Sequence, residues 1–197
     1  DCVERMHGGY PDALANFDTP QLTELRRIYF AELDKIVPSD FRAGVVIDKM
    51  PLNLIEVGLI HRVFPKAKFL FAQRDPRDCV LSCFMQHFVI NDAMANFLNL
   101  KAATRLYDKA MTLWQLYQAI MTLDVHTVRY ESLIEDFEGT VSPALDFLGL
   151  DWDDGVRNYA ETALQRGRIS TASYNQVTQD LYTSAQGRWE GYQGHLQ

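Results

Sequence analysis

Two arginines lie at the point where the spacing of apolar residues changes from a strand-like to a helix-like pattern. In FLFAQRDPRDCVLSCF, residues 69–84, Arg74 and Arg77 follow a strand-like run and precede a helix-like one. A helix N-terminus carries partial positive charge and free N–H groups, and an arginine adds a two-pronged donor that suits phosphate. Ser82, eight residues after Arg74, offers a hydroxyl on that helix. The spacing predicts a clamp for a phosphate monoester, with a surface ion pair to Asp78 as an equally weighted alternative.

Polar residues also follow two other predicted strands. Lys49 comes soon after AGVVI, residues 43–47, and Tyr130 comes directly after HTVR, residues 126–129. Ligands of parallel sheets bind at the carboxyl ends of the strands, so three such ends with polar side chains indicate one site. The alternatives are a solvated loop lysine at position 49 and a half-buried core tyrosine at position 130.

The elements that would position these residues alternate between strands and helices. The strands are expected at residues 43–47, 67–73 and 126–129, and the helices at 19–37 with Thr19 as N-cap, 52–64, from 76 on, 98–123, 141–148, 153–164 and around Trp189. Strands that alternate with helices predict an α/β fold whose parallel sheet is covered on both faces. Residues 166–187 show no period, and we interpret them as a long polar loop.

Composition narrows the functional classes. The chain of 197 residues suits a single domain spanning 1–197, and its net charge of −7 argues against nucleic-acid binding. No apolar run reaches the roughly 18 residues that a membrane span requires. Three cysteines (Cys2, Cys79 and Cys83) form no disulfide-rich pattern, which favours a reducing, cytoplasmic location. We interpret Cys79 and Cys83 as small buried residues.

An ordered set of motifs resembles the sulfotransferase superfamily. The run at residues 48–84 is followed in order by VRYESL (128–133), LDFLGLDW (145–152) and TASYNQVTQDLYTSAQGRWEGY (171–192). The likeness is to bacterial sulfotransferases associated with tetratricopeptide repeats and to tyrosylprotein sulfotransferases. It implies a P-loop-nucleotide-hydrolase-like fold, with a central parallel sheet flanked by helices.

The resemblance also implies a reaction. A sulfuryl group would pass from 3′-phosphoadenosine 5′-phosphosulfate (PAPS) to a hydroxyl of a peptide tyrosine, a sugar or a small molecule. The product would be 3′,5′-ADP, and no metal would take part. By position, the implied site residues are Lys49 facing the sulfuryl group, Arg74 and Ser82 on the 3′-phosphate, Tyr130 beside the nucleotide, and Ser173 and Arg188 closing over it.

The sequence departs from the family in one respect. It has no Gly/Ser/Thr-rich segment after an early strand to hold the phosphosulfate, and Gly8-Gly9 is its only early glycine pair. We therefore expect an N-terminally truncated domain whose first strand, phosphosulfate loop and general base lie upstream of Asp1, with His87 as a weaker candidate base. An exposed sheet edge would favour homo-oligomers.

Two other functions compete with this hypothesis. The first is a non-catalytic module that binds a 3′-phosphonucleotide or a partner protein. The second is a kinase-like phosphotransferase, which the missing Gly-Lys-Ser/Thr loop disfavours.

Overall fold

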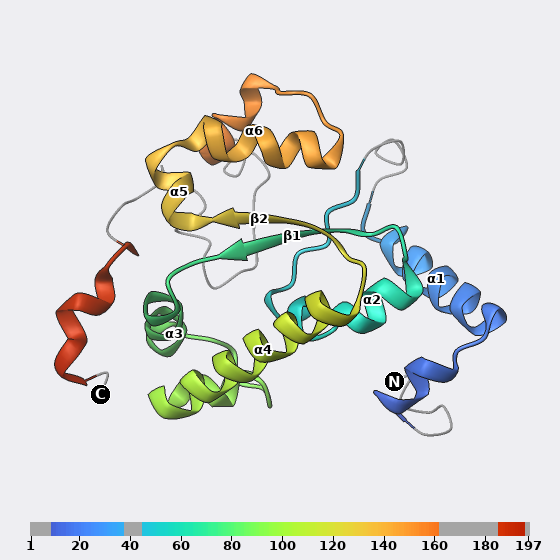
Figure 1. Cartoon of the computed structure of the whole chain (residues 1–197), viewed down its shortest axis with the longest axis horizontal. Helices are drawn as coiled ribbons and strands as arrows, with labels where there is room; N and C mark the ends of the chain where they lie inside the picture. The colour runs from blue at the N-terminus through green and yellow to red at the C-terminus, as the bar shows by residue number, and fades with distance from the viewer. Residues whose placement is uncertain (1–8, 38–44, 162–184, 196–197) are drawn as a thin grey trace. The chain divides into compact units, whose positions relative to one another are not determined.

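The computed structural model describes residues 9–37, 45–161 and 185–195 (Figure 1). The chain divides into two compact units. The first unit comprises residues 1–67 and 112–124, and the second comprises residues 68–111 and 125–197.

The described chain is rich in helix. The elements of the first unit are η1 (Asp12–Asn16), α1 (Thr19–Leu33), η3 (Pro51–Leu54) and α2 (Val57–Val63). Those of the second unit are β1 (Lys68–Gln73), α3 (Pro76–Met85), η4 (Met94–Leu98), nearly all of β2 (Asp124–Arg129), α5 (Tyr130–Glu135), α6 (Phe137–Leu148), η5 (Asp154–Val156) and η7 (Arg188–His195). Residues of α4 (Leu100–Ile120) belong to both units.

A two-stranded parallel sheet confirms the α/β class. β1 and β2 are hydrogen-bonded neighbours and run in the same direction (Figure 1). Exposed and half-buried residues alternate along β1, and Lys68, Leu70 and Ala72 are the exposed ones. One face of this strand is therefore more open than the two-sided cover that the sequence predicts.

The strand expected at residues 43–47 is wrong for its described part. Val45, Val46 and Ile47 belong to no strand, and their exposed fractions are 51%, 51% and 66%. Their β-branched side chains suit a strand, but a strand needs a neighbour to satisfy its backbone N–H and C=O groups. The described sheet pairs β1 only with β2.

The helix expected over residues 52–64 is interrupted. It consists of η3 and α2, with the break at Ile55 and Glu56. The Tyr117 hydroxyl donates a hydrogen bond of 3.0 Å to the Ile55 carbonyl. This side chain takes the place of a helical N–H at that carbonyl, and such an insertion interrupts a helix.

Most other expected helices are confirmed. The helix after Pro76 is α3, the segment 98–123 contains α4, and the segment 141–148 lies inside α6. The helix expected at 153–164 instead opens with the short η5 and resumes at Tyr159. The last helix, around Trp189, is the 3₁₀ helix η7.

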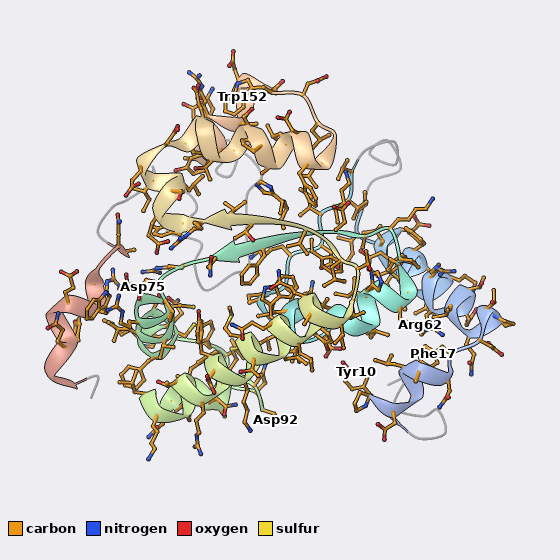
Figure 2. All side chains as sticks on the ribbon, in the orientation of Figure 1. Tyr10, Phe17, Arg62, Asp75, Asp92 and Trp152 are labelled. Atoms are coloured by element: carbon orange, nitrogen blue, oxygen red, sulfur yellow. The ribbon has the colours of Figure 1, made fainter. Side chains whose placement is uncertain are left out.

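In the first unit, α1 packs against α2 and the residues beside it. The rings of Tyr29, Phe30 and Phe64 meet edge to face, with centroids 5.1–5.9 Å apart. The Arg26 guanidinium donates a hydrogen bond of 2.6 Å to the Val63 carbonyl. Arg62 donates one of 3.0 Å to the carbonyl of Phe17 (Figure 2). Both arginines thus satisfy backbone oxygens outside their own helices.

None of the helices in the described ranges combines the length and apolarity needed to cross a membrane.

The N-cap of α1 is Asp18, one residue before the expected Thr19. Its carboxylate accepts a hydrogen bond of 2.9 Å from the Gln21 N–H, and the Gln21 side chain accepts one of 3.0 Å from the Asp18 N–H. This reciprocal capping box satisfies two backbone donors that the helix leaves unpaired.

The two positions can be separated by mutation. We expect Asp18→Ala to lower the free energy of unfolding by about 1 kcal/mol because it removes the cap. Thr19→Ala should change it by less than about 0.5 kcal/mol. Urea unfolding followed by circular dichroism measures both, and a larger effect at Thr19 would contradict the assignment.

Candidate functional site

The polar turn at the end of β1 begins with Arg74 and Asp75. Asp75 is the N-cap of α3 (Figure 2), and its carboxylate accepts a hydrogen bond of 2.8 Å from the Arg77 N–H. The same carboxylate pairs with the Arg77 guanidinium at 2.6 Å, and this hydrogen bond lowers the pKa of Asp75. Arg77 therefore forms a local surface pair with Asp75, where the sequence suggested Asp78. An exposed pair of this kind contributes little to stability.

Arg74 is held differently. Its guanidinium lies 5.1 Å from the centroid of the Tyr130 ring, and its Nη2 donates a hydrogen bond to the Ala185 carbonyl. Its Nε is buried and has no hydrogen-bond partner in the part of the chain that the structure describes. A buried N–H without an acceptor is unfavourable, so an anionic oxygen placed there would be stabilised. The donor set suits a phosphate group.

Tyr130 reaches Arg74 because β1 and β2 are parallel neighbours. Arg74 follows the end of β1, and Tyr130 follows the end of β2 as the first residue of α5. The next residue, Glu131, accepts a hydrogen bond of 2.8 Å from the Asp75 N–H through Oε1. Its carboxylate thereby ties the start of α5 to the turn that carries Arg74. Sequence reasoning missed this role of Glu131, because its partner lies 56 residues away.

A second carboxylate joins residues 185–195 to α3. Asp78 is 2% exposed, and no other charged side chain of the described ranges is buried. It accepts hydrogen bonds of 2.7 Å from the Gly187 N–H and 2.9 Å from the Trp189 N–H. The Arg77 guanidinium lies 3.5 Å from the centroid of the Trp189 ring. Residues 185–195 are thus bound to the first turn of α3.

These contacts bring part of the predicted site together. Arg74 and Tyr130 are in contact, and Arg188 lies between the two residues whose N–H groups bind Asp78. Ser82 is half-buried on α3, one turn beyond Asp78 and on the same helix face.

The other two predicted site residues, Lys49 and Ser173, stay predictions. Lys49 belongs to the first unit, where it is exposed just before η3, and Ser173 lies outside the described residues.

The segment before Lys49 contacts α1. The Asp48 carboxylate accepts hydrogen bonds of 3.3 Å from the Tyr29 hydroxyl and 3.4 Å from the Asn53 amide. The residue next to Lys49 therefore has hydrogen-bond partners within its own unit.

The comparison with protein families decides the class. A family model described as "Sulfotransferase family" matches residues 3–154. The chain belongs to the sulfotransferase family.

Individual relatives of the chain are distant. It is 27% identical over 188 residues to an uncharacterized protein of Aquifex aeolicus, a match that covers 95% of the chain and 24% of that protein. It is 27% identical to protein-tyrosine sulfotransferase 1 of Danio rerio, with 81% of the chain and 45% of the relative covered. For protein-tyrosine sulfotransferase 2 of Gallus gallus the identity is 26%, with coverages of 76% and 41%. The chain spans less than half the length of each of these relatives.

Metal ligands do not cluster in the ranges that the structure describes. No group of three or more His, Cys, Asp or Glu side chains there could hold a metal ion.

Two thiols lie beside Arg74 on α3. Cys79 and Cys83 are half-buried, so they are not the fully buried pair that the sequence suggests. A hydrogen bond from the Cys83 thiol lowers the pKa of Cys79 to about 7, and the charge of Arg74 adds to this effect against the opposing effect of burial. The same hydrogen bond raises the pKa of Cys83.

This asymmetry predicts selective alkylation. Because the thiolate is the reactive form, Cys79 should react with iodoacetamide at a rate that rises through a midpoint near pH 7. For an ordinary cysteine the midpoint lies at about pH 8.5. Peptide mass spectrometry resolves Cys79, Cys83 and Cys2.

The control variant is Cys83→Ala, which should move the Cys79 midpoint upward because the hydrogen-bond donor is lost. Equal rates and equal midpoints for Cys79 and Cys83 would contradict the assignment.

Proposed function

We propose that this chain takes part in sulfuryl transfer from PAPS to a hydroxyl acceptor. The observation that carries the proposal is the environment of Arg74, which follows one of two parallel strands. Its buried Nε has no acceptor among the residues that the structure describes. The start of a helix and an arginine together suit a phosphate group. Membership of the sulfotransferase family makes the 3′-phosphate of PAPS the anion to expect there.

The donor nucleotide would be held mainly by the second unit. In this proposal Arg74 and Ser82 bind the 3′-phosphate, and Tyr130 lies beside the nucleotide. Arg188 and Ser173 close over the nucleotide. Contact of the Arg74 guanidinium with the Tyr130 ring supports a shared site for these two residues.

Lys49 is the proposed catalytic residue. When bound, PAPS supplies both the sulfuryl group and a phosphate that can leave. The reaction depends on in-line positioning and on stabilising the negative charge that grows on the leaving oxygen. The Lys49 ammonium would stabilise that charge.

The acceptor is proposed to be a hydroxyl compound. Two relatives are named protein-tyrosine sulfotransferases, so a tyrosine-containing peptide is the first acceptor to test. The proposed fold is P-loop-nucleotide-hydrolase-like, supported by the parallel β1 and β2 and by the helices that follow each strand.

A second candidate is a module that binds a 3′-phosphonucleotide without transferring its sulfate. One observation favours it: Arg74 and Tyr130 are in contact within the second unit, and Lys49 does not belong to that unit. Both candidates need the phosphate site at Arg74, and only the first needs Lys49.

Calorimetric titration with 3′,5′-ADP tests the phosphate site. We expect Arg74→Ala to weaken binding by roughly 10- to 100-fold, because a charge-assisted hydrogen bond is lost. The matched control is Arg105→Ala, which removes an exposed arginine of α4 and should change the affinity by less than about threefold. No binding by the wild type, or equal affinities for wild type and Arg74→Ala, would exclude both candidates.

Transfer of labelled sulfate from PAPS to a tyrosine peptide, a sugar and a small phenol separates the two candidates. We expect Lys49→Ala to lower the transfer rate by at least about 100-fold while 3′,5′-ADP affinity falls less than about tenfold. Lys66→Ala, at another exposed lysine of the first unit, is the control and should keep the wild-type rate. A wild type that binds 3′,5′-ADP yet transfers nothing to any acceptor would support the binding module.

A further inference from the structure

We propose that Asp78 is a positioning residue that docks residues 185–195 against α3 and thereby places Arg188 for the donor nucleotide. The inference rests on the proposed function for its ligand. The docking itself rests only on contacts within the second unit.

The docking contacts converge on one turn of α3. Asp78 accepts both the Gly187 N–H and the Trp189 N–H, at 2.7 and 2.9 Å. The Ala185 carbonyl accepts a hydrogen bond from Arg74, and the Trp189 ring lies 3.5 Å from the Arg77 guanidinium. Backbone and side-chain groups from three residues of the segment therefore meet the stretch from Arg74 to Asp78.

The buried carboxylate makes this docking specific. At 2% exposure, Asp78 has exchanged water for two backbone donors, and an ionised acceptor forms stronger hydrogen bonds than a neutral one. If the segment left, the two N–H groups and the carboxylate would all need new partners. Gly187 assists, because its φ of +68° is a left-handed conformation that glycine adopts readily.

Arg188 is fixed by its neighbours. Since the N–H groups on both sides of it bind the same carboxylate, its backbone can only lie beside the first turn of α3. Arg74 sits four residues before Asp78, so the docking brings two arginines 114 positions apart to one end of the helix. A phosphate bound by both would favour the docked segment, and the docked segment would favour the phosphate.

In one substitution at Asp78, the loss of charge and the loss of docking should change the nucleotide affinity in opposite directions. Asp78→Asn removes a negative charge near the proposed phosphate, which by itself should strengthen 3′,5′-ADP binding. Asparagine has one acceptor oxygen, and its N–H₂ group would face the N–H of Gly187 or Trp189. Two donors cannot bond each other, so the segment should undock. We expect binding about tenfold weaker than wild type. Asp108→Asn, an exposed charge on α4, should leave affinity unchanged.

A second pair of variants changes the segment and leaves α3 intact. Gly187→Ala places a side chain in the left-handed conformation, and we expect it to weaken 3′,5′-ADP binding about 5- to 30-fold. Gly191→Ala is the control. Its added Cβ would meet nothing within 4 Å, so affinity should stay within about twofold.

Hydrogen exchange of peptides covering residues 185–195 reads the docking directly. In the wild type, 3′,5′-ADP should slow exchange there by at least about tenfold. In Asp78→Asn the exchange should be faster without nucleotide, and the nucleotide should restore little protection. The urea midpoint of global unfolding is recorded for each variant, because general destabilisation would move that midpoint and docking alone would not.

The outcomes separate the two proposals. Weaker binding together with faster exchange in Asp78→Asn and Gly187→Ala supports the inference. Wild-type affinity in either variant, or wild-type exchange in Asp78→Asn, overturns it. If the wild type binds no 3′,5′-ADP, the proposed function and the coupling fail together, and exchange of the ligand-free variants still decides whether Asp78 docks the segment.

Discussion

A buried carboxylate is the constraint on which the candidate site depends. Asp78 sits in the first turn of α3 and accepts two backbone N–H groups from residues 109 and 111 positions later. Burial of an ionised group is tolerated only when such donors replace water. Because the partners belong to the backbone of one short segment, satisfying Asp78 also fixes that segment beside Arg74.

The parallel pairing of β1 and β2 supplies the second constraint. Parallel neighbours end at the same edge of a sheet, so the residues after each strand meet there. Arg74 meets the Tyr130 ring, and the Asp75 N–H meets Glu131. Glu131 thus holds the turn that carries Arg74, and Asp78 holds the segment whose Ala185 carbonyl accepts from Arg74. The Arg74 Nε is buried and has no hydrogen-bond partner in the described ranges.

Local patterns were enough to find most of the elements. A six-residue segment rich in apolar residues indicates β1, and a proline after an acidic residue indicates the start of α3. Two of the errors have non-local causes. Tyr117 bonds the Ile55 carbonyl and interrupts the helix expected at 52–64. Residues 45–47 have strand-forming side chains but no described neighbour to pair with.

The sequence by itself determined the family, the α/β class and the candidates Arg74, Ser82 and Tyr130, because these depend on residue order and short spacings. Only the tertiary structure decided which of the two arginines forms a surface ion pair with a neighbouring residue. Arg77 pairs with Asp75, whereas Arg74 turns to Tyr130 and Ala185. It also decided that Asp78 is buried and not a surface charge. The physical reason is that the partners of Arg74 and Asp78 come from chain segments 56 to 111 residues away, which local spacing does not encode.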